Sequence, residues 1–249
     1  MTLLHDMHCH LDFMANGDEI ARDALAHGTL LFGNTVEPQA YEQVRTQFAP
    51  YENVFIGFGM HPWWVGENHV SLMVAIETLL EEHNPRFIGE IGLDLGKRHA
   101  NRRDEQIEAF FRIAQWAAER GDKLMSIHAV KSAPLALGLL EETGCLRSCH
   151  CIFHWFSGPS DTLKRAIDAG CYFSCGVRML STKKGREYAK AIPATQLLLE
   201  TDEPPAQGEL FSYADLRSSL ESAAASIAAI KGDEAFDIIS QTSASLLNG

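Results

Sequence analysis

Residues 86–128 have the sequence RFIGEIGLDLGKRHANRRDEQIEAFFRIAQWAAERGDKLMSIH and contain one complete β-α-β unit. Phe87–Ile91 and Leu124–Ile127 are short apolar runs, a pattern typical of strands that are buried on both faces. Between them, Asn101–Arg120 carries apolar residues three and four positions apart, which predicts a helix with one apolar face. Gly121 stands where that helix should end, as a C-terminal glycine does. This unit predicts a parallel sheet with a crossover helix.

The same alternation continues along the whole chain. The eight strands that we expect are Leu3–Met7, Leu30–Thr35, Val54–Phe58, Phe87–Ile91, Leu124–Ile127, Ser148–Phe153, Cys171–Ser174 and Leu197–Glu200. The helices that we expect are Asp18–His27, Gln39–Phe48, Val70–His83, Asn101–Arg120, Pro134–Thr143, Ser160–Ala169, Lys183–Ala191 and Tyr213–Lys231.

About eight such units in 249 residues predict an α/β fold of the TIM-type (β/α) barrel class, possibly distorted, as one domain over residues 1–249. A doubly wound open sheet is the alternative fold. It is disfavoured because the first turn lacks the phosphate-binding G-x-G-x-x-G pattern.

Composition excludes some classes of protein. Hydrophobic residues make up 46% of the chain, which is enough for a substantial core and argues against disorder. No stretch approaches the ~18 continuous apolar residues of a membrane span, and the N-terminus lacks the pattern of a signal peptide, so we expect a cytoplasmic protein without membrane association. The six cysteines are expected to be small buried residues in a reducing compartment.

The formal net charge of −12 disfavours sequence-independent attraction to a nucleic acid backbone. It does not exclude a nucleic acid substrate, because bound divalent cations would reverse the sign of the charge locally.

Polar residues follow the predicted strands at their C-terminal ends, where barrel enzymes place their active sites. The first strand leads into Asp6, His8 and His10. Because side chains alternate along an extended chain, these three lie on one face. If that face looks into the barrel, both imidazoles can reach one metal ion.

Four further strands place polar residues at the same end. These residues are Glu90, His128, His154, Glu200 and Asp202. Each motif alone is weak, since an isolated histidine in a strand is usually a core residue. Together, four imidazoles and two carboxylates suit two divalent ions, with a carboxylate able to bridge them. Such ligands accept zinc or manganese, and magnesium is possible though less at home with four imidazoles.

Six motifs in order along the chain carry a resemblance to a known family. They are DMHCHLD (Asp6–Asp12), GMHP (Gly59–Pro62), GEIGLD (Gly89–Asp94), IH (Ile127–His128), HWFSG (His154–Gly158) and ETDEP (Glu200–Pro204). The sequence resembles the TatD family of metal-dependent hydrolases, within the amidohydrolase-like barrels. Members of that family are associated with DNA exonuclease or related phosphodiesterase activity, and some with deacylation of D-aminoacyl-tRNA.

The resemblance implies two ions, each with its own ligands. The ligands of the first ion are His8, His10 and Asp202. Those of the second are His128 and His154, and Glu90 bridges the two ions. The resemblance also implies that His61, on the rim after the third strand, faces the substrate phosphate.

The expected chemistry is hydrolysis by a water that two metal ions activate. We expect Asp202 and Glu90 to be catalytic, with Asp202 both binding a metal and orienting or deprotonating the water. His61 and Arg178 are the candidates for binding an anionic group of the substrate. For Arg178, an exposed surface arginine is an equally good interpretation.

Asp6 and Glu200 are expected to have supporting roles. Asp6 lies deeper than the two histidines and is interpreted as a weak ligand or as a partner that holds an imidazole in one tautomer. Glu200 is interpreted either in the same way or as a buried carboxylate paired with a group at the barrel floor.

Two tryptophans, Trp63 and Trp64, follow the GMHP motif in a predicted rim loop. Exposed aromatic pairs can stack on bases, but they also pack a loop against its own scaffold. Five other histidines are expected at the surface or on helices without a chemical role. They are His5, His27, His69, His83 and His99.

Three departures from the family pattern weaken the nuclease prediction. Val130 replaces a common arginine, Ala206–Phe211 replaces a basic stretch, and the C-terminal end is shortened at Ser245–Gly249. The leading hypothesis is a TatD-like deoxyribonuclease or phosphodiesterase acting on single-stranded DNA or another phosphoester. The alternatives are an amide or ester hydrolase of the same barrel class, including an aminoacyl-ester deacylase, and a non-catalytic metal-binding subunit with protein partners.

Overall fold

The computed structural model describes residues 3–66 and 69–249, which fall into two compact units. Unit 1 comprises the chain up to Asn34 together with Glu42–Ile56 and Tyr172–Gly249. Unit 2 comprises Thr35–Tyr41 and Gly57–Cys171. The single domain over residues 1–249 stays a prediction.

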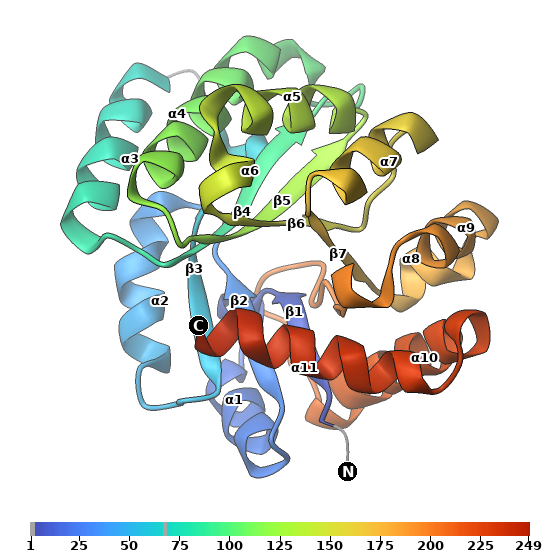
Figure 1. Cartoon of the computed structure of the whole chain (residues 1–249). Helices are drawn as coiled ribbons and strands as arrows, with labels where there is room; N and C mark the ends of the chain where they lie inside the picture. The colour runs from blue at the N-terminus through green and yellow to red at the C-terminus, as the bar shows by residue number, and fades with distance from the viewer. Residues whose placement is uncertain (1–2, 67–68) are drawn as a thin grey trace. The chain divides into compact units, whose positions relative to one another are not determined.

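The strands alternate with helices as the sequence predicts (Figure 1). The strands are β1 His5–Cys9, β2 Leu30–Asn34, β3 Val54–Met60, β4 Phe87–Asp94, β5 Leu124–Val130, β6 His150–His154, β7 Tyr172–Cys175 and β8 Leu197–Leu199. The α-helices are α1 Gly17–Ala26, α2 Tyr41–Phe48, α3 His69–His83, α4 Arg103–Arg120, α5 Ala133–Thr143, α6 Cys145–Ser148, α7 Ser160–Asp168, α8 Val177–Ser181, α9 Lys183–Ala191, α10 Tyr213–Lys231 and α11 Glu234–Asn248. The sheet order is the sequence order from β1 to β8, which is the strand order of a (β/α) barrel. The predicted fold class is confirmed.

In unit 1, β1 pairs in parallel with β2, and β7 pairs in parallel with β8. The register between β1 and β2 slips, because Asp6 lies opposite Leu31 whereas Cys9 lies opposite Gly33. Two residues, one of them His8, therefore face a single residue of β2. Such bulges re-aim side chains and are frequent beside active sites.

Unit 2 contains β4, β5 and β6, each parallel to the next. The register of β4 against β5 slips between Ile88 and Ile91, so Glu90 also lies in a bulge. Glycines permit the close approach of the strands here. A Cβ on Gly59 would lie 1.7 Å from the Thr35 carbonyl oxygen, and one on Gly92 would lie 2.1 Å from that of His128. Glu90 donates its backbone N–H to the same Thr35 oxygen at 2.8 Å.

The structure corrects several local predictions. The first strand is His5–Cys9 and not Leu3–Met7, and His5, expected at the surface, is buried. Ser148, predicted to start a strand, ends the short helix α6, and β6 begins at His150.

The terminal helix α11 is a further correction, because the sequence analysis left residues 234–248 without a predicted element. Its Ser- and Thr-rich second half has modest intrinsic helix propensity. The helix packs against β8 and β1 beside α10, where Leu246 and Leu247 are buried (Figure 1). Tertiary packing therefore stabilises this helix.

None of the helices in the described ranges has the length and apolar character that a bilayer span requires. The six cysteines are free thiols, of which Cys149 is half-buried and the others are buried.

Candidate metal centre

In unit 1, the three polar side chains that were predicted to share one face of the first strand are buried. They are Asp6, His8 and His10, and the rings of the two histidines meet edge to face with centroids 5.1 Å apart. His10 Nδ1 lies 2.9 Å from the Asn34 carbonyl oxygen. This contact fixes the orientation of the ring and leaves its Nε2 facing the other way.

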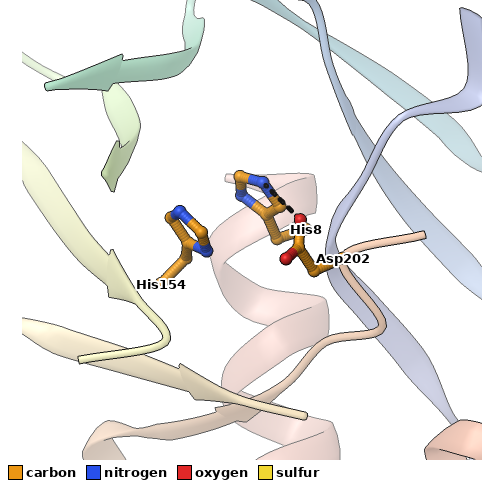
Figure 2. A group of neighbouring side chains, drawn as sticks. All are labelled: His8, His154 and Asp202. Carbon is orange, nitrogen blue, oxygen red and sulfur yellow. Dashed lines mark ion pairs between the residues drawn. The ribbon is translucent and has the colours of Figure 1, made fainter. Parts of the chain in front are cut away.

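Asp202 faces both imidazoles of unit 1. Its Oδ1 lies 3.8 Å from His8 Nε2 and 3.6 Å from His10 Nε2, and Figure 2 marks the first of these ion pairs. The backbone N–H of Asp202 donates to the His8 carbonyl at 2.9 Å, and the N–H of His10 donates to that of Glu203 at 2.9 Å. Asp202 has a φ of 56°, a left-handed conformation that aspartate tolerates better than most residues. The backbone therefore holds this carboxylate against the two histidines.

Asp6 stabilises the backbone of this group through hydrogen bonds. Its Oδ1 accepts hydrogen bonds from the backbone N–H of His8 at 3.2 Å and of Thr201 at 3.0 Å, and its Oδ2 accepts one from the Thr201 hydroxyl at 2.6 Å. Burial raises the pKa of Asp6 to about 7, although these hydrogen bonds oppose the shift. Asp6 thus holds the backbone on both sides of the site, whereas the sequence analysis paired it with an imidazole or a metal.

Arg178 lies beside the same carboxylate. Its Nη1 is 3.6 Å from Asp202 Oδ2, and its other terminal nitrogen donates to Glu203 Oε1. Burial raises the pKa of Glu203 even though Arg178 stabilises its charged form. The Arg178 side chain is 40% exposed to solvent. Its role in substrate binding stays a prediction. Glu200 accepts a hydrogen bond from Ser174 within the barrel, in agreement with the interpretation as a paired, buried carboxylate.

In unit 2, three imidazoles meet one carboxylate oxygen. Glu90 Oε1 lies 2.7 Å from His128 Nδ1, 2.8 Å from His154 Nε2 and 3.4 Å from His61 Nε2. All four side chains are buried. The sequence analysis placed His61 on the rim, facing substrate, and the structure places it within this group.

His128 is held by two carboxylates. Asp94 Oδ2 lies 3.5 Å from its Nε2, opposite the contact with Glu90. Burial lowers the pKa of His128, but the hydrogen bonds and negative charges of Asp94 and Glu90 outweigh it and raise the pKa to about 9. Asp94 in turn accepts hydrogen bonds from the indole of Trp63 and the N–H of Gly96. Burial alone would raise the pKa of Asp94. The interactions with His128, Trp63 and Gly96 outweigh burial and hold this pKa well below its usual range.

The donor set of unit 2 fits a divalent ion. In unit 2, the ligand atoms of His61, Glu90 and His128 lie within 4.8 Å of one another, which is close enough to share one ion. Imidazole and carboxylate together suit zinc, manganese and related first-row metals. Oxygen-only ligands, which calcium and magnesium prefer, are not what these residues offer.

Comparison with known proteins identifies the family. A model of the TatD related DNase family matches residues 5–247. The chain belongs to this family. It is 25% identical to the human protein named deoxyribonuclease TATDN3 over 98% of this chain and 93% of that protein. It is 30% identical to the 3'-5' ssDNA/RNA exonuclease TatD of Klebsiella pneumoniae over 77% of this chain and 73% of the relative.

Solved structures agree on the fold of this TatD family member. The YjjV TatD homologue of Escherichia coli has a TM-score of 0.74 at 22% identity, with 99% of this chain and 98% of that chain covered. A TatD family hydrolase of Entamoeba histolytica has a TM-score of 0.77 at 15% identity and covers 98% of this chain and 97% of its own. The predicted family, and the predicted class of metal-dependent hydrolase acting on ester bonds, are confirmed.

Sequence reasoning missed two residues that the structure adds to the site. Asp94 was noted only as part of the GEIGLD motif, and its contact with His128 could have been suspected from its place at the end of β4. His99, expected to have no chemical role, stacks on Trp63 with ring centroids 4.9 Å apart. No signal in the sequence indicated that contact. The side chain of His69 lies outside the described residues.

Proposed function

We propose that this TatD family member is a divalent-metal-dependent phosphodiesterase that hydrolyses single-stranded DNA. The observation that carries the proposal is the convergence of three buried imidazoles on Glu90 Oε1 in unit 2. Two relatives named as nucleases, one of them an exonuclease for single-stranded DNA and RNA, favour this substrate over the amide or ester alternatives.

We propose two divalent ions, zinc or manganese, with magnesium less favoured because the site offers imidazoles as well as carboxylates. His8, His10 and Asp202 in unit 1 would hold one, and Glu90, His128 and His154 in unit 2 would hold the other. When bound, such ions lower the pKa of a water, polarise the phosphoryl oxygens and neutralise the charge that develops in the transition state. A cytoplasmic location and the absence of a membrane partner remain part of the proposal, on the composition argument.

The side chains have distinct tasks in this mechanism. Asp202 would orient the attacking water and take up its proton, and Arg178, whose Nη1 lies 3.6 Å from Asp202 Oδ2, would keep this carboxylate ionised and in place. His61 Nδ1 accepts a hydrogen bond from the Trp63 backbone N–H at 3.2 Å, so the neutral ring carries its proton on Nε2. In the structure this nitrogen lies 3.4 Å from Glu90 Oε1, and we propose that it donates instead to a non-bridging oxygen of the phosphate when the substrate binds. Arg178, in unit 1, would bind an anionic group of the substrate.

The test combines metal content with hydrolysis of single-stranded DNA at low salt. Wild type, Asp202→Ala and Glu90→Ala are purified in parallel, and circular dichroism checks that each variant folds. We expect metal-dependent cleavage by wild type that both substitutions abolish. Cleavage that survives in both variants would show a contaminating nuclease. A wild-type protein that binds metal but leaves DNA intact would refute the proposed substrate.

A further inference from the structure

Two large aromatic side chains of unit 2 are exposed to solvent. Trp63 is 52% exposed and Trp64 is 39% exposed, on the 3-10 helix Pro62–Trp64 that follows β3. Exposed tryptophans in a pair are uncommon in a soluble domain and point to a binding surface.

The exposed rings are ordered in a nearly parallel set. The Trp63 ring makes an angle of 11° with His99 at 4.9 Å between centroids and of 13° with Trp64 at 6.2 Å. These three rings are called the Trp63 platform below. Trp63 Nε1 donates to Asp94 Oδ2 at 2.6 Å, so the half-exposed Trp63 ring is fixed by a hydrogen bond as well as by its ring contacts. A platform that is already ordered loses little conformational entropy when a ligand stacks on it.

The Trp63 platform lies beside two histidines of the unit 2 group, His61 and His128. The Trp63 ring meets that of His61 edge to face at 4.9 Å and that of His128 at 6.4 Å. The Trp64 ring also contacts His61, at 5.4 Å. A flat group attached next to a phosphate at these histidines would therefore reach the tryptophan rings.

Positive charge accompanies the platform. Lys97 and Arg98 directly precede His99. Both cations are exposed on a chain that carries a net charge of −12. Aromatic rings that stack on bases, next to cations that follow a phosphate backbone, are the features by which proteins bind single strands.

We propose that the Trp63 platform, with Lys97 and Arg98, is the subsite for the nucleotides beside the scissile phosphodiester. A base stacks on Trp63 and Trp64, and the two cations contact the adjacent phosphates. The proposal rests on the proposed function and sharpens its substrate class. Because a base inside a duplex has both faces covered, the platform selects single strands with free bases over duplexes.

The test measures binding separately from cleavage. Fluorescence anisotropy in an Asp202→Asn background, where cleavage does not interfere, compares an oligothymidylate with an abasic oligomer of the same length. Trp63→Ala is expected to weaken binding of the oligothymidylate about 5- to 150-fold, the range for loss of one base stack, with little effect on the abasic oligomer. Trp63→Phe retains a ring but loses the hydrogen bond to Asp94, and it should recover most of the binding.

Two further variants complete the design. Val74→Ala removes an apolar side chain that is 60% exposed on α3, and it should bind both oligomers as wild type does. The pair Lys97→Gln and Arg98→Gln should weaken both oligomers and lower the slope of log affinity against log salt by about 0.7 for each lost phosphate contact.

Specific results would overturn the subsite. Equal weakening of both oligomers by Trp63→Ala would show that the ring acts only through Asp94 and His128. Unchanged binding, or no binding of oligothymidylate by the protein with Trp63 intact, would also refute it. Cleavage by the enzyme with Asp202 intact is scored separately. Ring-dependent binding without cleavage would support the subsite while refuting the proposed hydrolysis.

Discussion

The two groups of candidate ligands are held in different ways. In unit 1, Asp202 faces His8 and His10 at 3.8 and 3.6 Å, and backbone hydrogen bonds fix the carboxylate in place. In unit 2, Glu90 contacts His128 and His154 directly at 2.7 and 2.8 Å. One group is positioned by its backbone, and the other is held by contacts among its own side chains.

This difference has an electrostatic cause. Glu90 is surrounded by three imidazoles and has Asp94 beyond one of them, so carboxylates and protonated histidine stabilise one another in a buried site. Asp202 is 22% exposed and shares its charge with Arg178. The unit 2 group therefore depends more strongly on each of its members than the unit 1 group does.

The largest effect is expected from Glu90→Ala. It removes the contact point of three buried imidazoles and a candidate metal ligand, so kcat/KM for single-stranded DNA should fall at least roughly 10²- to 10³-fold, the range for removing one group that stabilises a transition state electrostatically. Bound metal, measured by elemental analysis, should fall as well. Glu90→Gln preserves the shape without the charge, and full activity in that variant would contradict the role of the charge.

The next effect is the pH dependence of stability. The pKa values of two buried histidines, His5 and His128, shift in opposite directions, and His5 provides the test. Burial lowers the pKa of His5 to about 4 from a reference of 6.5, and its ring accepts a hydrogen bond from the Leu30 N–H at 3.1 Å. Between pH 6.5 and 4 the unfolded chain therefore binds more protons than the folded protein. The free energy of unfolding should be full above pH 6.5 and should fall by up to about 3 kcal/mol as the pH falls to 4. Urea unfolding of the metal-free protein across this range measures it.

The control for the pH effect is His5→Gln, which has no titrating ring. Its stability should fall less than that of wild type between pH 6.5 and 4. Parallel losses in the two proteins would show that His5 does not cause the acid effect.

A smaller effect is expected from Asp94→Asn. Asp94 raises the pKa of His128 and lies opposite Glu90, so the substitution should weaken metal binding about 10- to 100-fold, as loss of an outer partner of a ligand does. Metal titration above pH 9, where His128 is deprotonated, removes the competition between protons and metal for this ring. A loss of affinity that persists there comes from the lost orientation of His128. Trp63→Phe is the matched control, because it removes the indole hydrogen bond to Asp94 but keeps the carboxylate. Unaltered metal affinity in Asp94→Asn would exclude the supporting role.

The smallest effect is expected from Arg178→Ala if the guanidinium only steadies Asp202. An exposed ion pair contributes about 0–1 kcal/mol, which corresponds to a loss of up to about fivefold in kcat. A rise in KM of more than tenfold with little change in kcat would instead show that Arg178 binds the substrate. Steady-state kinetics at low and high salt distinguishes the two.

Several features could be predicted because they depend on local rules. Alternation along β1 put Asp6, His8 and His10 on one face, and all three are buried. The amphipathic pattern from residue 101 to 120 predicted α4, which begins at Arg103. These predictions required only the geometry of a strand and of a helix.

Other features depended on contacts between distant segments. Thr201 holds Asp6 across 195 positions, and no local pattern pairs them. His5 is buried in β1, where it lies opposite Leu30 of β2 and accepts a hydrogen bond from the Leu30 N–H. Helix α11 forms because Leu246 and Leu247 find buried positions against other elements.

The sequence by itself determined which residue types stand at the ends of the strands, because strand periodicity and the order of the motifs are local properties of the chain. The tertiary structure decided which atoms meet. Bulges at His8 and Glu90, each with two residues opposite one, aim these side chains, and glycines such as Gly92 allow the strands to approach. Burial and neighbouring charge then shifted the pKa values of His5 and His128 in opposite directions. Register and environment arise only when separate segments pack together, so no local pattern records them.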